Sequence, residues 1–383
     1  MPWAWLLDKE LCEVPFSAPD RRGVPMLRLW FWPILFLAAA LLPGAAVPAP
    51  AAAQTRIVAV GDLHGDHDAW RAIAAAAGVM DQQGHWSGGK TTLVQMGDIV
   101  DRGPQSLQII QDLMRLQREA GRSGGRVIVL VGNHEAMMMT GDMRYVTPGE
   151  LAAFTDRKSA QRRRQTYAAN QAKIEAAYRA KFPDMPAKAI RDAWMETMPP
   201  GMLEYQAAWA PDGNLGRWEL QNPAVLRLGD TLFVHGGISA AYAAIPIPEI
   251  NRRVTDALKA RDSSPTSIIN DPHGPLWYRG LVTRSGSDET TVAPASANAT
   301  AAALTIDQEI DLVLKSQEVK RIVVAHTPSL SGIVSATGGR LWRVDSGNSR
   351  AYGGSPSYLE IVGDRVTAHP VQRPAGPSWG AAR

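Results

Sequence analysis

The chain repeats one pattern, a short apolar run of strand length that ends in a cluster of polar residues. The runs cover residues 57–60, 93–96, 127–131, 231–234 and 322–325. Between the first runs, apolar residues recur at helical spacing, as in Trp70, Ile73 and Ala77. Strands that alternate with helices predict βαβ units and a mainly parallel sheet, so the predicted fold class is α/β. In such sheets function lies beyond the carboxyl ends of the strands, and the polar clusters fall there.

The polar clusters contain the oxygen and nitrogen donors of a metal site. In chain order they are Asp62 and His64, Asp98, Asn133 and His134, His235, and His326. Two divalent ions about 3.5–4 Å apart need a bridging carboxylate with histidine and oxygen donors on either side, and Asp98 is the natural bridge. The single cysteine, Cys12, cannot form a thiolate cluster, so any metal must be held by Asp, Asn and His. The alternative interpretation is a set of turn and helix-cap residues.

Composition and charge exclude several classes of protein. The chain has 383 residues, of which 45% are hydrophobic and 20% are charged, and this excludes disorder, collagen and coiled coil. Its 40 Lys and Arg against 37 Asp and Glu give a formal net charge of +3. Such a weak field does not indicate nucleic acid as the main partner.

The first 53 residues have the layout of an upstream segment followed by a secretory signal peptide. Residues 27–53 comprise the basic Arg28, an apolar run, and small residues that end in Ala51-Ala52-Ala53. We expect translation to start at Met26 and the segment of about 26–53 to be removed. The mature protein would then be periplasmic or secreted, without stable membrane insertion. The alternative is an uncleaved signal that anchors the protein in the membrane, which the apolar length would just allow.

The rest of the chain divides into one domain and a tail. We expect the domain over residues 55–371 and the tail over 372–383. A helix-rich cap insert interrupts the domain at about 141–211. Residues of about 283–303 are rich in Ser, Thr and Ala, which predicts a flexible loop. Hairpins that turn at glycine are predicted at 225–234, 333–344 and 359–371.

Five motifs resemble those of the calcineurin-like metallophosphatases. They are Gly61-Asp62-Leu63-His64-Gly65, Gly97-Asp98-Ile99-Val100-Asp101-Arg102-Gly103, Gly132-Asn133-His134-Glu135, Val234-His235-Gly236-Gly237 and Val324-Ala325-His326-Thr327. Segments 275–280 and 344–354 are similar to the Shewanella-like members of the phosphoprotein phosphatase branch. The resemblance covers about residues 56–371. It implies a four-layer αββα sandwich of two mixed β-sheets flanked by helices, with the helical insert as a cap.

The resemblance also implies the cofactors and their ligands. It implies two divalent metal ions per chain, of Mn, Fe, Zn or Co. The implied ligands are Asp62, His64 and Asp98 for the first ion, and Asp98, Asn133, His235 and His326 for the second. A water molecule that both ions acidify would attack phosphorus in line.

Four residues are implied to act on the phosphate group. By resemblance, His134 protonates the leaving oxygen, Asp101 orients His134, and Arg102 and Arg279 bind the phosphoryl oxygens. Many phosphodiesterases of the superfamily carry a second histidine two residues after the position of His326, and here that position is Pro328. This departure favours phosphate monoesters over diesters.

We therefore expect a metallophosphoesterase that hydrolyses phosphate monoesters, with a phosphotyrosine-like group of a small molecule or a phosphoprotein as substrate. The alternative activity is hydrolysis of nucleotides, dinucleoside polyphosphates or phosphodiesters. A non-catalytic module that binds metal or phosphate is the alternative from another class, and the intact set of His134, Asp101 and Arg102 disfavours it. The sequence predicts neither the metal nor the oligomeric state.

Overall fold

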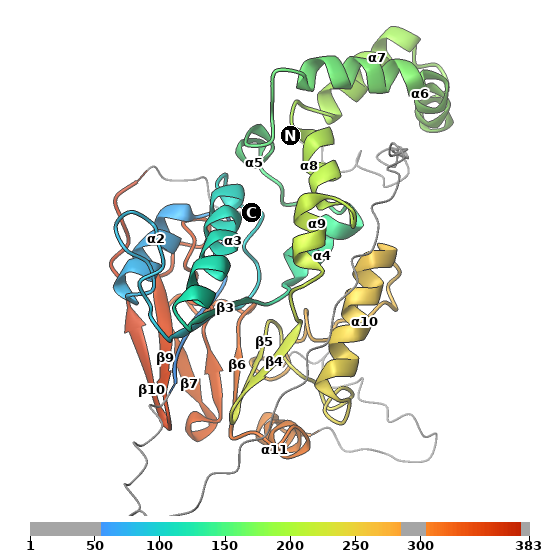
Figure 1. Cartoon of the computed structure of the whole chain (residues 1–383). Coiled ribbons are helices and arrows are strands. Elements are labelled where there is room, and N and C mark those ends of the chain that lie inside the picture. The colour runs from blue at the N-terminus through green and yellow to red at the C-terminus, as the bar shows by residue number, and fades with distance from the viewer. Residues whose placement is uncertain (1–54, 285–303, 377–383) are drawn as a thin grey trace, which may run out of the picture.

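Two five-stranded sheets form the centre of the computed structural model, which describes residues 55–284 and 304–376 (Figure 1). The strands of the first sheet are, in spatial order, β10 (Arg365–Pro370), β9 (Ser357–Val362), β1 (Arg56–Val60), β2 (Thr92–Gln95) and β3 (Arg126–Val129). Those of the second are β4 (Val225–Leu228), β5 (Thr231–Val234), β6 (Arg321–Val324), β8 (Leu341–Arg343) and β7 (Val334–Ala336). The predicted α/β class is confirmed.

Both sheets are mixed, with parallel strands at their centres. β1, β2 and β3 run parallel, and so do β5, β6 and β8. The other strands pair antiparallel, because they belong to the hairpins β4–β5, β7–β8 and β9–β10, and β9 also pairs with β1. The three predicted hairpins are confirmed, and they are the reason that the expectation of a mainly parallel sheet holds only for the central strands.

One apolar layer lies between the sheets, and helices cover their other faces. Side chains alternate along β1: Ile57 and Ala59 pack in the layer that also contains Phe233 of the second sheet, whereas Val58 and Val60 belong to the outer core. Helices α2 (His67–Ala76) and α3 (Ser106–Arg122) flank the first sheet, and α10 (Ile247–Ala260) and α11 (Ile306–Ser316) lie by the second (Figure 1). This is the arrangement of two mixed sheets flanked by helices that the resemblance implies.

A group of helices follows β3 before the chain enters the second sheet. They are α4 (Asn133–Thr140), α5 (Pro148–Ala152), α6 (Ser159–Lys181), α7 (Ala187–Thr197), α8 (Met202–Trp209) and α9 (Asn214–Glu219). A short 3-10 helix, η1 (Thr337–Gly339), lies apart from this group, between β7 and β8. Helices α5 to α8 fall within the expected insert, and α9 follows its expected end. In Figure 1, α6 and α7 lie at the end of the molecule that is farthest from the sheets.

Some sequence expectations concern residues that lie outside the described parts of the chain. These are the signal peptide at 26–53, most of the loop at 283–303, and the last residues of the tail, 377–383. In the described parts, no helix is both long enough and apolar enough to cross a membrane. Helix α3 begins at Ser106, because the N–H group of Gln105 still bonds to the carbonyl oxygen of Gly65 in the preceding loop.

Candidate active site

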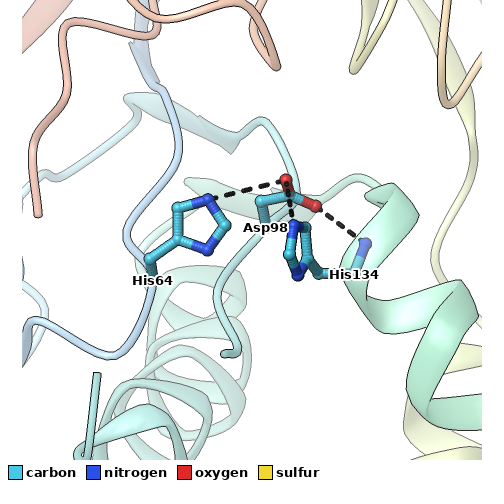
Figure 2. A group of neighbouring side chains, drawn as sticks. All are labelled: His64, Asp98 and His134. Atoms are coloured by element: carbon cyan, nitrogen blue, oxygen red, sulfur yellow. Dashed lines mark hydrogen bonds and ion pairs between the residues drawn. The ribbon is translucent and has the colours of Figure 1, made fainter. Parts of the chain in front are cut away.

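The loops that follow the central strands bring the predicted metal ligands together. Asp62 and His64 follow β1, Asp98 follows β2, Asn133 and His134 begin α4, His235 follows β5, and His326 follows β6. Ligand atoms of His64, Asp98 and His134 lie within 4.8 Å of one another, and so do those of Asp98, His235 and His326. Asp98 belongs to both groups, and Figure 2 shows the first group converging on its carboxylate.

Hydrogen bonds to the backbone fix the tautomers of two histidines. Nδ1 of His64 donates to the carbonyl oxygen of Val100 at 2.9 Å, and Nδ1 of His235 donates to that of Met96 at 2.8 Å. In the neutral ring Nε2 then carries a lone pair. It lies 3.7 Å from Oδ2 of Asp98 in His64 and 3.3 Å from the same oxygen in His235. Two electron-rich atoms face each other in both pairs, an arrangement that a cation between them would satisfy.

Three further side chains complete the set of donors. Nε2 of His326 is buried and has no hydrogen-bond partner among the described residues. Oδ1 of Asn133 lies 3.0 Å from Nε2 of His235, which has no hydrogen to donate in this tautomer. Asp62 accepts a hydrogen bond from the N–H group of His326 at 3.3 Å, and its other oxygen lies 3.8 Å from Nε2 of His64. The donor set therefore fits borderline divalent ions that take mixed nitrogen and oxygen ligands.

Burial keeps two of these histidines in the uncharged form that binds metal. It lowers the pKa of His64 to about 3, and it lowers the pKa of His326 well below its usual range. Burial alone would raise the pKa of Asp98. The nearby histidines, of which His235 has the largest effect, hold that pKa well below the usual range. An anion beside the neutral imidazoles of His64 and His326 suits a metal site. For His235 burial lowers the pKa, but the charge of Asp98 raises it above the usual value, so a bound cation would have to displace a proton there.

Several site residues have a left-handed backbone conformation. The φ angles are 40° at His64, 55° at Asp98, 69° at Asp101, 65° at Arg102 and 63° at His326. A non-glycine residue in this region costs on the order of 1–3 kcal/mol, and such residues persist only where the surrounding structure fixes them. Backbone strain is therefore concentrated in the loops of this site.

Glu135 fixes the loop that carries Asp98. Its carboxylate accepts hydrogen bonds from the backbone N–H groups of Asp98 and Ile99, both at 2.8 Å, and from that of Gly132 at 3.1 Å. A Cβ atom at Gly132 would collide with the backbone nitrogen and Oδ1 of Asp98. Glycine is therefore required there for Asp98 to lie against the start of α4.

His134 lies beside the metal ligands and pairs with Asp101. Its Nδ1 is 2.5 Å from Oδ2 of Asp101, which is fully buried, and its backbone N–H group donates to Oδ1 of Asp98 at 3.0 Å. Nε2 lies 3.9 Å from Oδ2 of Asp98 (Figure 2). With Nδ1 bonded to Asp101, Nε2 is the nitrogen that faces the site.

The two predicted phosphate-binding arginines lie in different environments. Cζ of Arg102 is 4.4 Å from the ring centroid of Tyr145 and 5.2 Å from that of Tyr352. Such cation–π contacts hold a guanidinium through its face and leave its N–H groups for an anion. Arg279 is exposed, and its Nη1 donates to the carbonyl oxygen of His326 at 2.8 Å. The two arginines thus lie on opposite sides of the histidines.

Two buried carboxyl groups next to the site carry no role predicted from the sequence. Asp345 follows β8, burial raises its pKa to about 6, and together with burial its charge raises the pKa of Asp62. Glu150, in α5, accepts a hydrogen bond from the N–H group of Asp101 at 3.4 Å. Asp345 lies in segment 344–354, whose similarity to the Shewanella-like phosphatases could have indicated that it belongs to the site. Glu150 and Tyr145 lie in the insert, which matches none of the quoted motifs.

Comparison with known proteins identifies relatives along most of the chain. The family described as calcineurin-like phosphoesterase matches residues 55–330. Shewanella-like protein phosphatase 2 of Arabidopsis thaliana is 31% identical over 334 residues, which cover 83% of this chain and 79% of that protein. Shewanella-like protein phosphatase 1 of Plasmodium berghei is 26% identical and covers 82% of this chain and 73% of the relative.

Solved structures share the fold. A cold-active protein-tyrosine phosphatase of a psychrophilic Shewanella species has a TM-score of 0.57 at 24% identity, and covers 83% of this chain and 81% of its own. A further structure of a cold-active protein tyrosine phosphatase, at 1.1 Å, has a TM-score of 0.59 at 23% identity, with 84% and 79% covered. These similarities, the family match and the relatives lead to one conclusion: the chain belongs to the calcineurin-like phosphoesterases and is a hydrolase of that family.

Proposed function

We propose that the protein hydrolyses phosphate monoesters at a dinuclear metal site, with aryl phosphates such as phosphotyrosine as the preferred class. The observation that carries this proposal is the pairing of His134 with Asp101 directly beside Asp98, the carboxylate common to both groups of ligand atoms. A proton donor next to a shared ligand is what cleavage of an ester with a poor leaving group requires.

In this proposal Asp62, His64 and Asp98 hold one ion, and Asp98, Asn133, His235 and His326 hold the other. The ions would supply Lewis acidity and an activated water when bound. His134 carries a proton on Nε2 and gives it to the oxygen that leaves phosphorus. Asp101 accepts the hydrogen bond from Nδ1, which fixes the ring and stabilises its protonated form.

The arginines bind the non-bridging phosphate oxygens. Arg102 is held between the rings of Tyr145 and Tyr352, so its planar fork of donors is oriented before the substrate arrives. Nη1 of Arg279 donates to the carbonyl oxygen of His326 and to Oγ1 of Thr327, and its other two nitrogens are left for the phosphate. Both charges match the negative charge that the transition state spreads over the oxygens.

Two observations support an aryl leaving group. The relatives are named as protein phosphatases, and the fold neighbours as protein tyrosine phosphatases. In addition, the ring of Tyr145 lies 5.2 Å from that of His134, the ring of Tyr352 lies 5.3 Å from that of His64, and the ring of Trp277 lies 5.6 Å from that of His326. Aromatic side chains around the ligands offer flat surfaces to an aromatic substrate.

A substrate panel tests the proposal. Protein purified with measured metal content is assayed with phenyl phosphate, a phosphotyrosine peptide, a phosphoserine peptide, ATP, a dinucleoside polyphosphate and bis(p-nitrophenyl) phosphate. We expect the largest kcat/KM on the aryl monoesters. Higher kcat/KM on the nucleotides or on the diester would overturn the proposal and favour the alternative activities. No turnover of any ester by fully loaded protein would indicate a binding module.

We also propose that the protein is exported, on the strength of the signal-peptide layout of residues 26–53. The mass of the mature protein and its amino-terminal sequence test this directly. A start near Gln54 in a periplasmic or culture fraction is the expected result. A mature chain that retains residues 26–53 in the membrane fraction would instead indicate an uncleaved anchor.

A further inference from the structure

One segment of the insert, residues 145–150, packs against the loop that carries Asp101 and Arg102. The N–H group of Arg102 donates to the carbonyl oxygen of Tyr145 at 3.0 Å, and the N–H group of Asp101 donates to Oε1 of Glu150 at 3.4 Å. Two successive backbone donors of the loop are therefore satisfied by the same short segment, which is far from it in the sequence.

These two hydrogen bonds act at a strained point of the backbone. Asp101 and Arg102 have φ angles of 69° and 65°, and neither is glycine. This conformation is strained, so it must be held by surrounding contacts. Leaving a buried N–H group unpaired would destabilise the loop further. The segment at 145–150 is thus positioned to keep the loop in its observed conformation.

Glu150 is fixed on several sides. It is 1% exposed, its backbone N–H group donates to Oγ1 of Thr147 at the start of α5, and the hydroxyl of Tyr205 donates to its Oε1 at 3.4 Å. The same hydroxyl contacts the sulfur of Met138 at 2.8 Å, in the helix that begins at Asn133. The carboxyl group of Glu150 therefore lies between the N–H group of Asp101 and the hydroxyl of Tyr205, and that hydroxyl in turn contacts the helix that carries His134.

Burial of the Glu150 carboxyl group is energetically unfavourable. Burial first, and then the charge of Asp101, raises the pKa of Glu150 to about 8. No ion pair from Lys, Arg or His to Glu150 is found in residues 55–284 and 304–376, and its Oε2 has no hydrogen-bond partner there. Burying a polar group without full compensation destabilises a protein. Among the contacts of its carboxyl group, the hydrogen bond from the N–H group of Asp101 is the one that reaches the strained loop.

We propose that Glu150 is a positioning residue for the acid pair of Asp101 and His134, an inference that rests on the proposed function. By accepting the N–H group of Asp101, it keeps that residue left-handed and so directs Oδ2 of Asp101 to Nδ1 of His134. Glu150 does not touch the substrate. Its loss should therefore slow only the reactions that need a proton on the leaving oxygen.

Leaving-group dependence separates this role from a merely structural one. We compare phenyl phosphate, which needs the proton, with 2,4-dinitrophenyl phosphate, whose leaving group departs without one. Because general acid catalysis contributes about 10²–10⁴-fold, Glu150→Ala should lower kcat on phenyl phosphate by at least ~10-fold and leave kcat on the dinitrophenyl ester within about 3-fold. Glu150→Gln keeps an oxygen that accepts the N–H group and should restore most of the activity. Combined with His134→Ala, Glu150→Ala should have no additional effect.

Matched variants keep the test decisive. Asp112→Asn removes another buried carboxylate, between α2 and α3, and should leave the ratio of the two activities unchanged. Where Glu150→Ala does not fold, Glu150→Asp, too short to reach the loop, takes its place with the same expected pattern. Equal losses on both esters, or losses that persist in the His134→Ala background, would overturn the inference. If the wild type is active and the Glu150 variant loses activity equally on both esters, only the inference about Glu150 fails and the proposed function stands. If the metal-loaded wild type hydrolyses neither ester, the proposed function itself is refuted.

Discussion

Nε2 of His235 lies 3.3 Å from Oδ2 of Asp98, and the hydrogen of that imidazole is on the opposite nitrogen, bonded to the carbonyl oxygen of Met96. Two lone pairs therefore face each other in a fully buried place, and His64 repeats the arrangement from the other side of Asp98 at 3.7 Å. Burial lowers the pKa of His235, but the charge of Asp98 raises it above the usual value, so a proton can join this pair when no cation does. We therefore expect bound cations to compete with protons here and to stabilise the site.

The first prediction concerns removal of metal. Treatment with a chelator should abolish phosphate ester hydrolysis and lower Tm, and both should return when a divalent ion is added back, because ions that bind only the folded state stabilise it by mass action. Elemental analysis, calorimetry and activity measured on the same sample provide the test. Asp98→Asn should lose bound metal, whereas Asp112→Asn should retain it. Full hydrolysis by protein shown to be free of metal would contradict the prediction.

The second prediction concerns Gly132. Gly132→Ala should greatly lower metal content and activity, because the added methyl group would displace Asp98 from the start of α4. Gly121→Ala is the matched control, since a Cβ atom at Gly121, near the end of α3, meets nothing within 4 Å. The control should be neutral or stabilise the protein by roughly 0.5–1 kcal/mol. Equal metal content in the two variants would show that the close approach at Gly132 is not required.

The sequence was sufficient to predict the centre of the fold and the meeting of the polar side chains that follow its strands. Each ligand follows directly on a short apolar strand, so local pattern and chain order determine which side chains meet at the carboxyl edge of the sheets. The lone pairs of His64 and His235 depend on backbone carbonyls of Val100 and Met96, which no side-chain motif reveals. The convergence of these side chains was therefore predictable, whereas the tautomers of the two histidines were not.

Contacts from the insert could not be predicted from the sequence. The bond from Asp101 to Glu150 joins residues 49 positions apart, and it forms only because the chain folds back after α4. Tyr145 reaches Arg102 through the same return of the chain. Helical spacing predicts which residues of the insert face inward, but it does not indicate which loop of the core they meet.

The third prediction concerns the arginines. Arg102→Ala should lower kcat/KM for aryl phosphates by about 10²-fold or more, because it removes oriented donors from the transition-state charge. Arg102→Lys should recover only part of this loss, since an ammonium group cannot match the planar fork that the two tyrosine rings hold. Arg279→Ala should have the smaller effect, because this side chain is exposed to solvent. Inhibition constants for inorganic phosphate provide an independent readout, and values unchanged in Arg102→Ala would contradict the assignment.

The fourth prediction concerns stability against pH. The pKa of Glu150 is raised to about 8 by burial and by the charge of Asp101, and the hydroxyl of Tyr205 is the other titratable group that bonds to it. In the unfolded chain this carboxyl group has the ordinary glutamate pKa of 4.5, so between pH 4.5 and 8 the folded state binds the extra proton. Its contribution to the free energy of unfolding therefore falls as pH rises through this window and is constant above it. Glu150→Gln cannot ionise, so its stability relative to wild type should increase from pH 5 to pH 8 and then level off. Urea unfolding at several pH values measures this difference. Gly121→Ala should run parallel to wild type throughout, and a Glu150→Gln curve that also runs parallel would mean that Glu150 ionises normally in the folded protein.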